Sequence, residues 1–126
     1  MKKYCKITPE GTRDLLFEEC LTYRNIEKLL AGVFQSRGFH EVITPGLEYY
    51  DVFSQGESSI PQEFMFKVTD NKGRLMVVRP DSTLPIARLT ATRLQNELKP
   101  QRQIYTQKLY HNYTSLRGRI NEINQS

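Results

Sequence analysis

Apolar side chains near the start of the chain recur at spacings of three and four, which is the spacing of one face of an α-helix. The pattern predicts an amphipathic helix over Leu16–Arg37, with Arg37 in its last turn, where the helix dipole favours a cation. Gly38 is expected to end this helix, and Asp14 or Thr12 to cap its start. The apolar stripe is broad and consists of Leu16, Phe17, Cys20, Leu21, Ile26, Leu29, Leu30, Val33 and Phe34.

Extended and turn-forming segments follow this helix. Residues 39–44 predict a short strand, which Pro45-Gly46 closes. Residues 47–53, which are rich in Tyr, predict a second extended or irregular segment. Residues 54–62 combine Ser, Gly and Pro, and this composition predicts an exposed and mobile loop.

A β-hairpin is predicted further along the chain. Residues 64–69 and 75–79 are rich in apolar and β-branched residues, and Asp70-Asn71-Lys72-Gly73 between them is a turn signal. Pro80 should stop the second strand. Because this second strand is apolar on both faces, it should lie in the centre of a sheet rather than at its edge.

A second helix is predicted over Ile86–Leu98. Asp81-Ser82-Thr83 supplies N-cap chemistry before it, Pro85 suits a first helical turn, and Pro100 should break the helix. The positions expected to face inward are Ile86, Leu89 or Thr90, Leu94 and Leu98.

Two more β segments are predicted, over residues 104–110 and 120–125. No internal repeat or linker divides residues 1–126, which are expected to form one unit. Because strands follow one another through a hairpin, the fold class is α+β, an antiparallel sheet flanked by helices. An unfinished edge strand is a liability, so the chain is expected to be cut from something longer or completed by a partner.

Composition places the chain among globular proteins, with 38% hydrophobic and 25% charged residues. The net charge of +4 agrees with an anionic ligand or RNA, or with a fragment whose acidic partner segment lies elsewhere. The sequence has neither a signal peptide nor an apolar run of about 18 residues, so the cytoplasm is the expected compartment. Cys5 and Cys20 are expected to be thiols, and no metal-ligand spacing surrounds them, His40 or His111.

Two segments could carry chemistry. Asp81 and Thr83 should stand at a strand end before a helix N-terminus, where a carboxylate, a hydroxyl and free N–H groups suit an amino-acid or phosphate-bearing ligand. The alternative is that Asp81 or Thr83 only caps the helix, and both interpretations remain open. Arg117 and Arg119, around Gly118, either hold a phosphate or carboxylate or form a solvated loop tip.

Five blocks across residues 8–125, in the right order and spacing, resemble the histidyl branch of the class II aminoacyl-tRNA synthetases. The helix ending at Gly38 and the segment Glu41-Val42-Ile43-Thr44-Pro45 are similar to motif 1, whose proline-ended strand packs at the dimer interface in that family. The other blocks are Pro9–Asp14, the Phe64–Asp70 hairpin, Arg79-Pro80-Asp81-Ser82-Thr83 and the run to Gln125. The resemblance implies the N-terminal part of a class II core, with motifs 1 and 2 present and motif 3 absent.

The histidyl branch has two members, the synthetases and the regulatory subunits of ATP phosphoribosyltransferase, and three features favour the second. Asp81-Ser82-Thr83-Leu84-Pro85-Ile86-Ala87-Arg88 resembles the regulatory subunits. His111 matches the motif 2 arginine, and an imidazole cannot supply a permanently charged, bidentate fork. Tyr113 matches the glutamate that reads adenine. Because one such electrostatic donor is typically worth about 3–4 kcal/mol, aminoacylation is not expected.

The resemblance also implies ligand roles. Asp81 and Thr83 match the positions that hold the amino group of histidine, and Gln125 matches a glutamine that contacts bound histidine. His111 lies in the same histidine-like pocket, and Pro45 matches the dimer interface. No catalytic residue, metal ligand or cofactor is expected in this chain.

The function that these features imply is that of a regulatory subunit of ATP phosphoribosyltransferase, in the first step of histidine biosynthesis. Such a subunit does no chemistry alone; its catalytic partner condenses ATP with phosphoribosyl pyrophosphate, using Mg²⁺. Expected partners are that catalytic subunit, a second copy through motif 1 and histidine as an allosteric ligand, but neither tRNA nor a membrane. The alternatives are a histidyl-tRNA synthetase fragment and a stand-alone sensor of histidine or tRNA.

Overall fold

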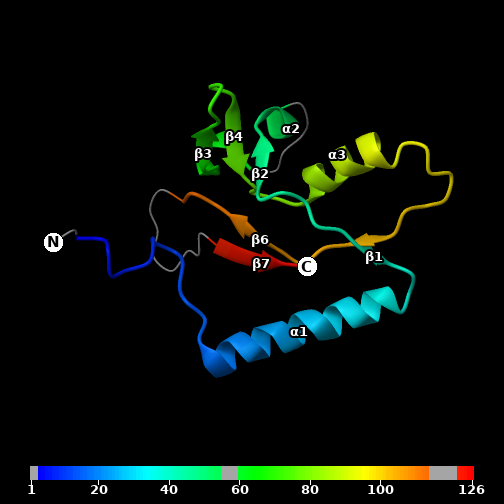
Figure 1. Cartoon of the computed structure of the whole chain (residues 1–126), viewed down its shortest axis with the longest axis horizontal. Coiled ribbons are helices and arrows are strands. Elements are labelled where there is room, and N and C mark those ends of the chain that lie inside the picture. The colour runs from blue at the N-terminus through cyan, green and yellow to red at the C-terminus, as the bar shows by residue number, and fades with distance from the viewer. Residues whose placement is uncertain (1–2, 55–59, 114–121) are drawn as a thin grey trace.

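The computed structural model describes residues 3–54, 60–113 and 122–126. Within these residues the strands form three small sheets, and two long helices, α1 and α3, accompany them (Figure 1). Most strand pairs are antiparallel, and the mixture of helices with such sheets confirms the predicted α+β class. Of the predicted loop over 54–62, residues 55–59 lie outside the described residues.

Helix α1 spans Phe17–Gln35, close to its predicted range. Its N-cap is Leu16, which makes no side-chain capping bond, so the prediction that Asp14 or Thr12 caps the helix is wrong. The Thr12 hydroxyl instead donates to the Pro9 carbonyl at 2.6 Å, because the chain turns there before the helix begins.

The end of α1 is as predicted in one respect and different in another. Gly38 adopts a left-handed φ of 85°, which confirms that it follows the helix as the predicted stop. The helix itself already ends at Gln35, so Arg37 lies beyond the last turn and not within it. The carbonyl of Arg37 accepts a hydrogen bond from Arg102 Nη1 at 3.3 Å, which ties this end to the segment before β5.

The apolar side of α1 is not covered by the rest of the described chain. No residue of this helix is buried, and its half-buried residues are Cys20, Glu27 and Ala31. The side chains that form its main apolar side, called here the α1 stripe, remain 39–69% exposed: Ile26, Leu29, Leu30, Val33 and Phe34. The helix therefore turns a small and polar edge toward its own chain and leaves its apolar stripe open.

The main sheet contains β2 (Leu47–Tyr49), β4 (Leu75–Val78) and β3 (Lys67–Thr69) in the order β2-β4-β3, all antiparallel. This arrangement confirms both the predicted hairpin and the central place of its second strand. Strand β3 is shorter than predicted, because a 3₁₀ turn, η1 (Gln62–Phe64), takes up the start of the predicted strand.

The buried core lies against this sheet. Phe53, Met65 and Val77 form it, with Leu84 among the partly buried residues packed around them. Phe53 belongs to α2 (Asp51–Ser54), so the predicted extended segment 47–53 is extended only over β2.

The second long helix, α3, spans Thr83–Arg93 and not the predicted Ile86–Leu98. It begins earlier because Ser82 is its N-cap, and Pro85 is buried within the first turn. It ends well before Pro100, and Leu98 is 98% exposed, so the prediction that Leu98 faces inward is wrong.

The predicted strands 39–44 and 104–110 differ from the observed ones because the pairing changes along the chain, and residues 120 and 121 of the predicted strand 120–125 lie outside the described residues. Strand β1 (His40–Glu41) pairs in parallel with β5 (Gln103–Ile104), while β6 (Gln107–Tyr110) pairs antiparallel with β7 (Glu122–Gln125). The predicted strand 104–110 is thus two strands, split where the partner changes from β1 to β7. The predicted strand 39–44 ends at Glu41, and the Thr44 N–H bonds a side chain instead of a strand.

Candidate functional site

Asp81 and Thr83 lie where the sequence predicted, in the turn between β4 and α3. Pro80 is fully buried after the strand, and Ser82 is the residue before the first residue of α3. The Asp81 carboxylate accepts the Thr83 N–H at 3.1 Å, and the Thr83 hydroxyl lies 3.4 Å from the other carboxylate oxygen. Asp81 therefore satisfies the first N–H of the helix from the position before the N-cap, while the N-cap itself is Ser82, which makes no side-chain capping bond. Thr83 remains exposed.

Gln125 is connected to this turn through Tyr105, a residue that the sequence did not single out. The Tyr105 hydroxyl donates to Gln125 Oε1 at 2.9 Å. Burial raises the pKa of the Tyr105 phenol above its ordinary value, and the negative charge of Asp81 raises it further. The Tyr105 hydroxyl is therefore bonded to Gln125 and is also influenced by the charge of Asp81.

His111 also points to the same turn. Its Nε2 lies 2.7 Å from the Pro80 carbonyl, and its Nδ1 lies 3.0 Å from the Tyr113 hydroxyl. A carbonyl only accepts, so Nε2 carries the proton, and in the neutral ring Nδ1 accepts from the Tyr113 hydroxyl. Both ring nitrogens of His111 are therefore engaged inside the chain.

A buried polar network lies beneath the turn. Gln107 Oε1 accepts from the Thr44 N–H at 2.8 Å and from the Thr44 hydroxyl at 3.2 Å. The same side chain donates from Nε2 to the Ser82 hydroxyl at 2.9 Å. Ser82, Thr44 and Gln107 are 0%, 3% and 6% exposed, so these bonds are shielded from water.

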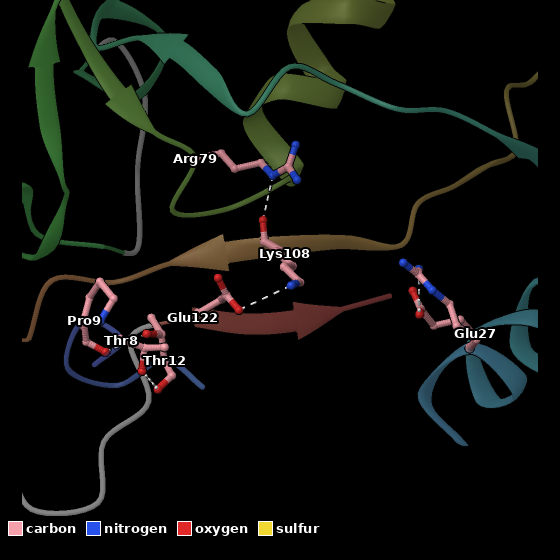
Figure 2. Close-up of polar contacts among 8 residues, drawn as sticks. Thr8, Pro9, Thr12, Glu27, Arg79, Lys108 and Glu122 are labelled. Carbon is pink, nitrogen blue, oxygen red and sulfur yellow. Dashed lines mark hydrogen bonds and ion pairs between the residues drawn. The ribbon is translucent and has the colours of Figure 1, made fainter. Parts of the chain in front are cut away.

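Arg79 adds a second link between the same segments. Its Nε donates to the Lys108 carbonyl at 2.6 Å, as Figure 2 shows, and its Nη1 donates to the Thr44 carbonyl at 2.9 Å. The guanidinium fork therefore joins β4 to β6 and to the segment that precedes Pro45. Pro45 itself is exposed.

Two cavities lie near β6 and β7, on other parts of the surface. One of about 450 Å³ is lined by Arg24 of α1, Lys108 of β6 and Arg79, which follows β4, among others, and one of about 550 Å³ is lined by residues within 8–14 with Tyr110 and Glu122. Neither is lined by Asp81, Thr83 or Gln125. The surrounding cations have partners, because Arg13 pairs with Glu19, Arg24 with Glu27, and Lys108 Nζ with Glu122 at 3.4 Å (Figure 2).

Some predictions fall outside these observations. Arg117 and Arg119, proposed as an anion contact, lie outside the described residues. Among residues 3–54, 60–113 and 122–126, no cluster of three or more His, Cys, Asp or Glu side chains could hold a metal ion. In the same residues, no helix has the length and apolar character needed to cross a membrane.

Comparison with known proteins identifies the class. Residues 11–126 match the family model described as histidyl-tRNA synthetase, and the chain therefore belongs to the histidyl-tRNA synthetase family. A solved histidyl-tRNA synthetase from S. aureus, without ligand, is similar in fold, with a TM-score of 0.76 and 25% identity over 94% of this chain and 31% of its own.

Within this family, similar relatives bear one particular name, ATP phosphoribosyltransferase regulatory subunit. The relative from Clostridium acetobutylicum is 47% identical over all of this chain, and that from Acetivibrio thermocellus is 50% identical over 78% of it. The alignments cover 30% and 23% of these two relatives, so the chain spans less than a third of their length. A solved structure from Bacillus halodurans, described as an ATP phosphoribosyltransferase regulatory subunit/histidyl-tRNA synthetase, has a TM-score of 0.84 and 33% identity, covering 98% of this chain and 31% of its own. These findings confirm the resemblance inferred from the sequence.

Asp81, Thr83 and Gln125 were identified from the sequence, and Ser82 was noted as part of the N-cap segment before α3. Tyr105 and Gln107 were not identified, because their contacts depend on the fold. One signal was available: Gln107 is a polar residue between apolar strand positions, where a buried amide needs partners.

Proposed function

We propose that this chain is part of a regulatory subunit of ATP phosphoribosyltransferase, which carries out no aminoacylation. The protein would bind a catalytic phosphoribosyltransferase subunit and set its activity and its inhibition by histidine. The observation that carries the proposal is the name shared by the relatives that are 40–47% identical over the whole chain.

The surroundings of His111 support the proposal independently of names. In the synthetases that this chain resembles, the matching residue is an arginine that binds the α-phosphate of ATP. Here the imidazole bonds the Pro80 carbonyl and the Tyr113 hydroxyl, so neither nitrogen is directed to a ligand. An imidazole, unlike a guanidinium, supplies no permanently charged, bidentate fork for a phosphate.

The turn at Asp81 supports histidine as the ligand. Asp81 offers a carboxylate and Thr83 an exposed hydroxyl, and Tyr105 and Gln125 add two polar groups that are bonded to each other. A free α-amino group would pair with Asp81, and a charge-assisted bond of this kind typically contributes about 1.5–3 kcal/mol. The pocket would thus bind histidine in response to its concentration without activating this amino acid for transfer.

Self-association through motif 1 follows from the α1 stripe. An apolar helix face that is open in the described chain is the kind of surface that forms a protein interface. The exposed segment around Pro45 adjoins Ile43, which is 80% exposed. A second copy and the catalytic subunit are the proposed partners, and the catalytic partner would supply the Mg²⁺ site. The proposed compartment is the cytoplasm.

Pyrophosphate exchange that depends on both histidine and ATP separates this proposal from a histidyl-tRNA synthetase. The full-length protein that contains this chain should give only background exchange, because His111 and Tyr113 replace the two residues that bind ATP in motif 2. Robust exchange would contradict the regulatory role. A synthetase of the same family provides the positive control.

A further inference from the structure

The two neighbours of Asp81 are held by the same strand region. On one side, Pro80 offers its carbonyl to His111 Nε2 at 2.7 Å. On the other side, Ser82 accepts from Gln107 Nε2 at 2.9 Å. Gln107 belongs to β6 and His111 directly follows it, so both bonds come from one segment. Asp81 lies between the two contacts, and its carboxylate accepts the Thr83 N–H of the same turn.

We infer that Gln107 and His111 are positioning residues that clamp the turn Pro80–Thr83 from both sides and so fix the Asp81 carboxylate at the pocket. Gln107 additionally connects this clamp to Thr44, and through Thr44 to the exposed segment at Pro45. The inference deepens the proposed function, on which the ligand part of it rests.

The chemistry of Gln107 fits this role. A carboxamide presents an acceptor and a donor at fixed positions, and here the acceptor takes both Thr44 groups while the donor reaches Ser82. All three residues are buried, so water cannot replace a lost partner. A leucine of similar size would release Ser82 and leave the Thr44 N–H unpaired.

The clamp makes the turn and the motif 1 segment move as one unit. Thr44 is held at its N–H and hydroxyl by Gln107 and at its carbonyl by Arg79. Displacement of the Pro45 segment would therefore pull on Gln107, and Gln107 would pull on Ser82, next to Asp81. The geometry offers a short physical route from a candidate interface to the ligand pocket.

Hydrogen–deuterium exchange of the full-length protein, without ligand, tests the clamp directly. The Thr83 N–H is bonded to Asp81, so its protection reports the position of that carboxylate. In Gln107→Leu, the amides of residues 81–84 should exchange about five- to tenfold faster, the factor expected when one net hydrogen bond is lost. Gln103→Leu is the matched control, because Gln103 contacts Thr90 and not the turn.

The outcomes are distinct. Faster exchange confined to residues 81–84 in Gln107→Leu, with wild-type exchange there in Gln103→Leu, supports the clamp. Wild-type exchange in Gln107→Leu, or an equal rise across the whole chain, overturns it. If Gln107→Leu does not fold, Ser82→Ala keeps the Gln107–Thr44 bonds and should still give a local rise of about threefold; no local rise would overturn the inference.

Titration with L-histidine then separates the clamp from the proposed ligand. If the wild-type protein binds histidine, Gln107→Leu should weaken binding about tenfold relative to Gln103→Leu. If the wild-type protein does not bind histidine, the ligand assignment fails, while the exchange experiment still decides whether the clamp exists. Binding that is equal in both variants, together with unchanged exchange, would leave no positioning role for Gln107.

Discussion

The turn at Pro80–Thr83 and helix α1 differ in whether their side chains find partners within the described chain. In the turn, short segments from β4, β6 and the residues before β2 meet, and Gln107, Ser82 and Thr44 are buried and hydrogen bonded to one another. In α1, a much longer segment has no buried residue, and its apolar stripe stays open. The polar side chains of the turn have their partners within the described chain, whereas the α1 stripe is uncovered there.

The difference shows where the chain depends on other surfaces. A polar network that is buried and paired contributes its stability locally, because each donor already has its acceptor. An apolar helix face contributes only when something covers it, at about 25 cal/mol per Å² of area removed from water. We therefore expect changes in the turn to alter stability and ligand binding, and changes in the stripe to alter association.

The largest effect is expected for Leu30→Asp on the α1 stripe. A charge in the middle of an apolar interface must be desolvated without a partner, so self-association should weaken by roughly a hundredfold or more. Sedimentation of the purified chain at micromolar concentration measures this. Leu21→Asp is the matched control: Leu21 belongs to the broad stripe predicted from the sequence, but it lies roughly half a turn away from Leu30 around the helix, at about 100° per residue, and outside the α1 stripe. A wild-type chain that sediments as a clean monomer would contradict the interface.

The next effect is expected for Asp81→Ala in the full-length protein. Loss of the carboxylate removes the partner of the ligand amino group, so histidine binding should weaken roughly ten- to a hundredfold. The Thr83 N–H also loses its acceptor, which should lower stability by about 1 kcal/mol. Calorimetric titration beside a thermal melt separates the two roles. Unchanged affinity with a lowered melting temperature would leave Asp81 as a cap only.

A smaller effect is expected for Arg79→Lys, which keeps the charge. Lysine cannot reproduce the fork that donates to the carbonyls of Lys108 and Thr44, so about 1–2 kcal/mol of stability should be lost. Chemical denaturation of wild type and variant gives the difference. Arg93→Lys, at the exposed end of α3, is the control. Equal stability of the Arg79 variant and wild type would show that the fork does not hold these segments together.

The smallest effect concerns the hairpin turn and its pH dependence. The backbone N–H of Arg74, followed by its guanidinium and the N–H of Lys72, lowers the pKa of Asp70. A lowered carboxyl pKa stabilises the fold above the unfolded value, near about 3.9, and this contribution is lost as pH falls through the folded pKa. Asp70→Asn should therefore melt below wild type at neutral pH, and the gap should close in acid. A gap that is constant with pH would contradict this assignment.

The parts of the fold that were predictable from sequence are those with local signals. Three features indicate their structure without tertiary information: the periodicity of α1, the turn Asp70–Gly73 and the apolar second strand. Gly38 likewise marks the helix end, because glycine readily adopts the left-handed φ of 85° found there. Strand lengths were not predictable, because the neighbouring strand changes from β1 to β7 between Ile104 and Gln107. The local sequence does not show where a neighbouring strand ends.

The candidate site divides in the same way. Asp81, Thr83 and Gln125 were identified because a resemblance supplied their roles, and Asp81 was also visible as a carboxylate before a helix. Tyr105 and Gln107 were not identified, since their contacts join residues that are 20 to 63 positions apart. The cap of α1 was predicted wrongly, because the helix begins only at Phe17 with Leu16 as its N-cap, and Thr12 lies in a turn before it, where its hydroxyl donates to the Pro9 carbonyl.

The most direct test of the regulatory role is the turnover of the catalytic ATP phosphoribosyltransferase subunit, measured with and without the full-length protein that contains this chain. The two proteins should co-purify, and addition of the full-length protein should raise turnover or change its inhibition by histidine. The Leu30→Asp and Asp81→Ala variants, assayed beside wild type, would show whether the α1 stripe or the pocket carries the effect. Absence of physical association, with turnover and histidine inhibition both unchanged, would contradict the account.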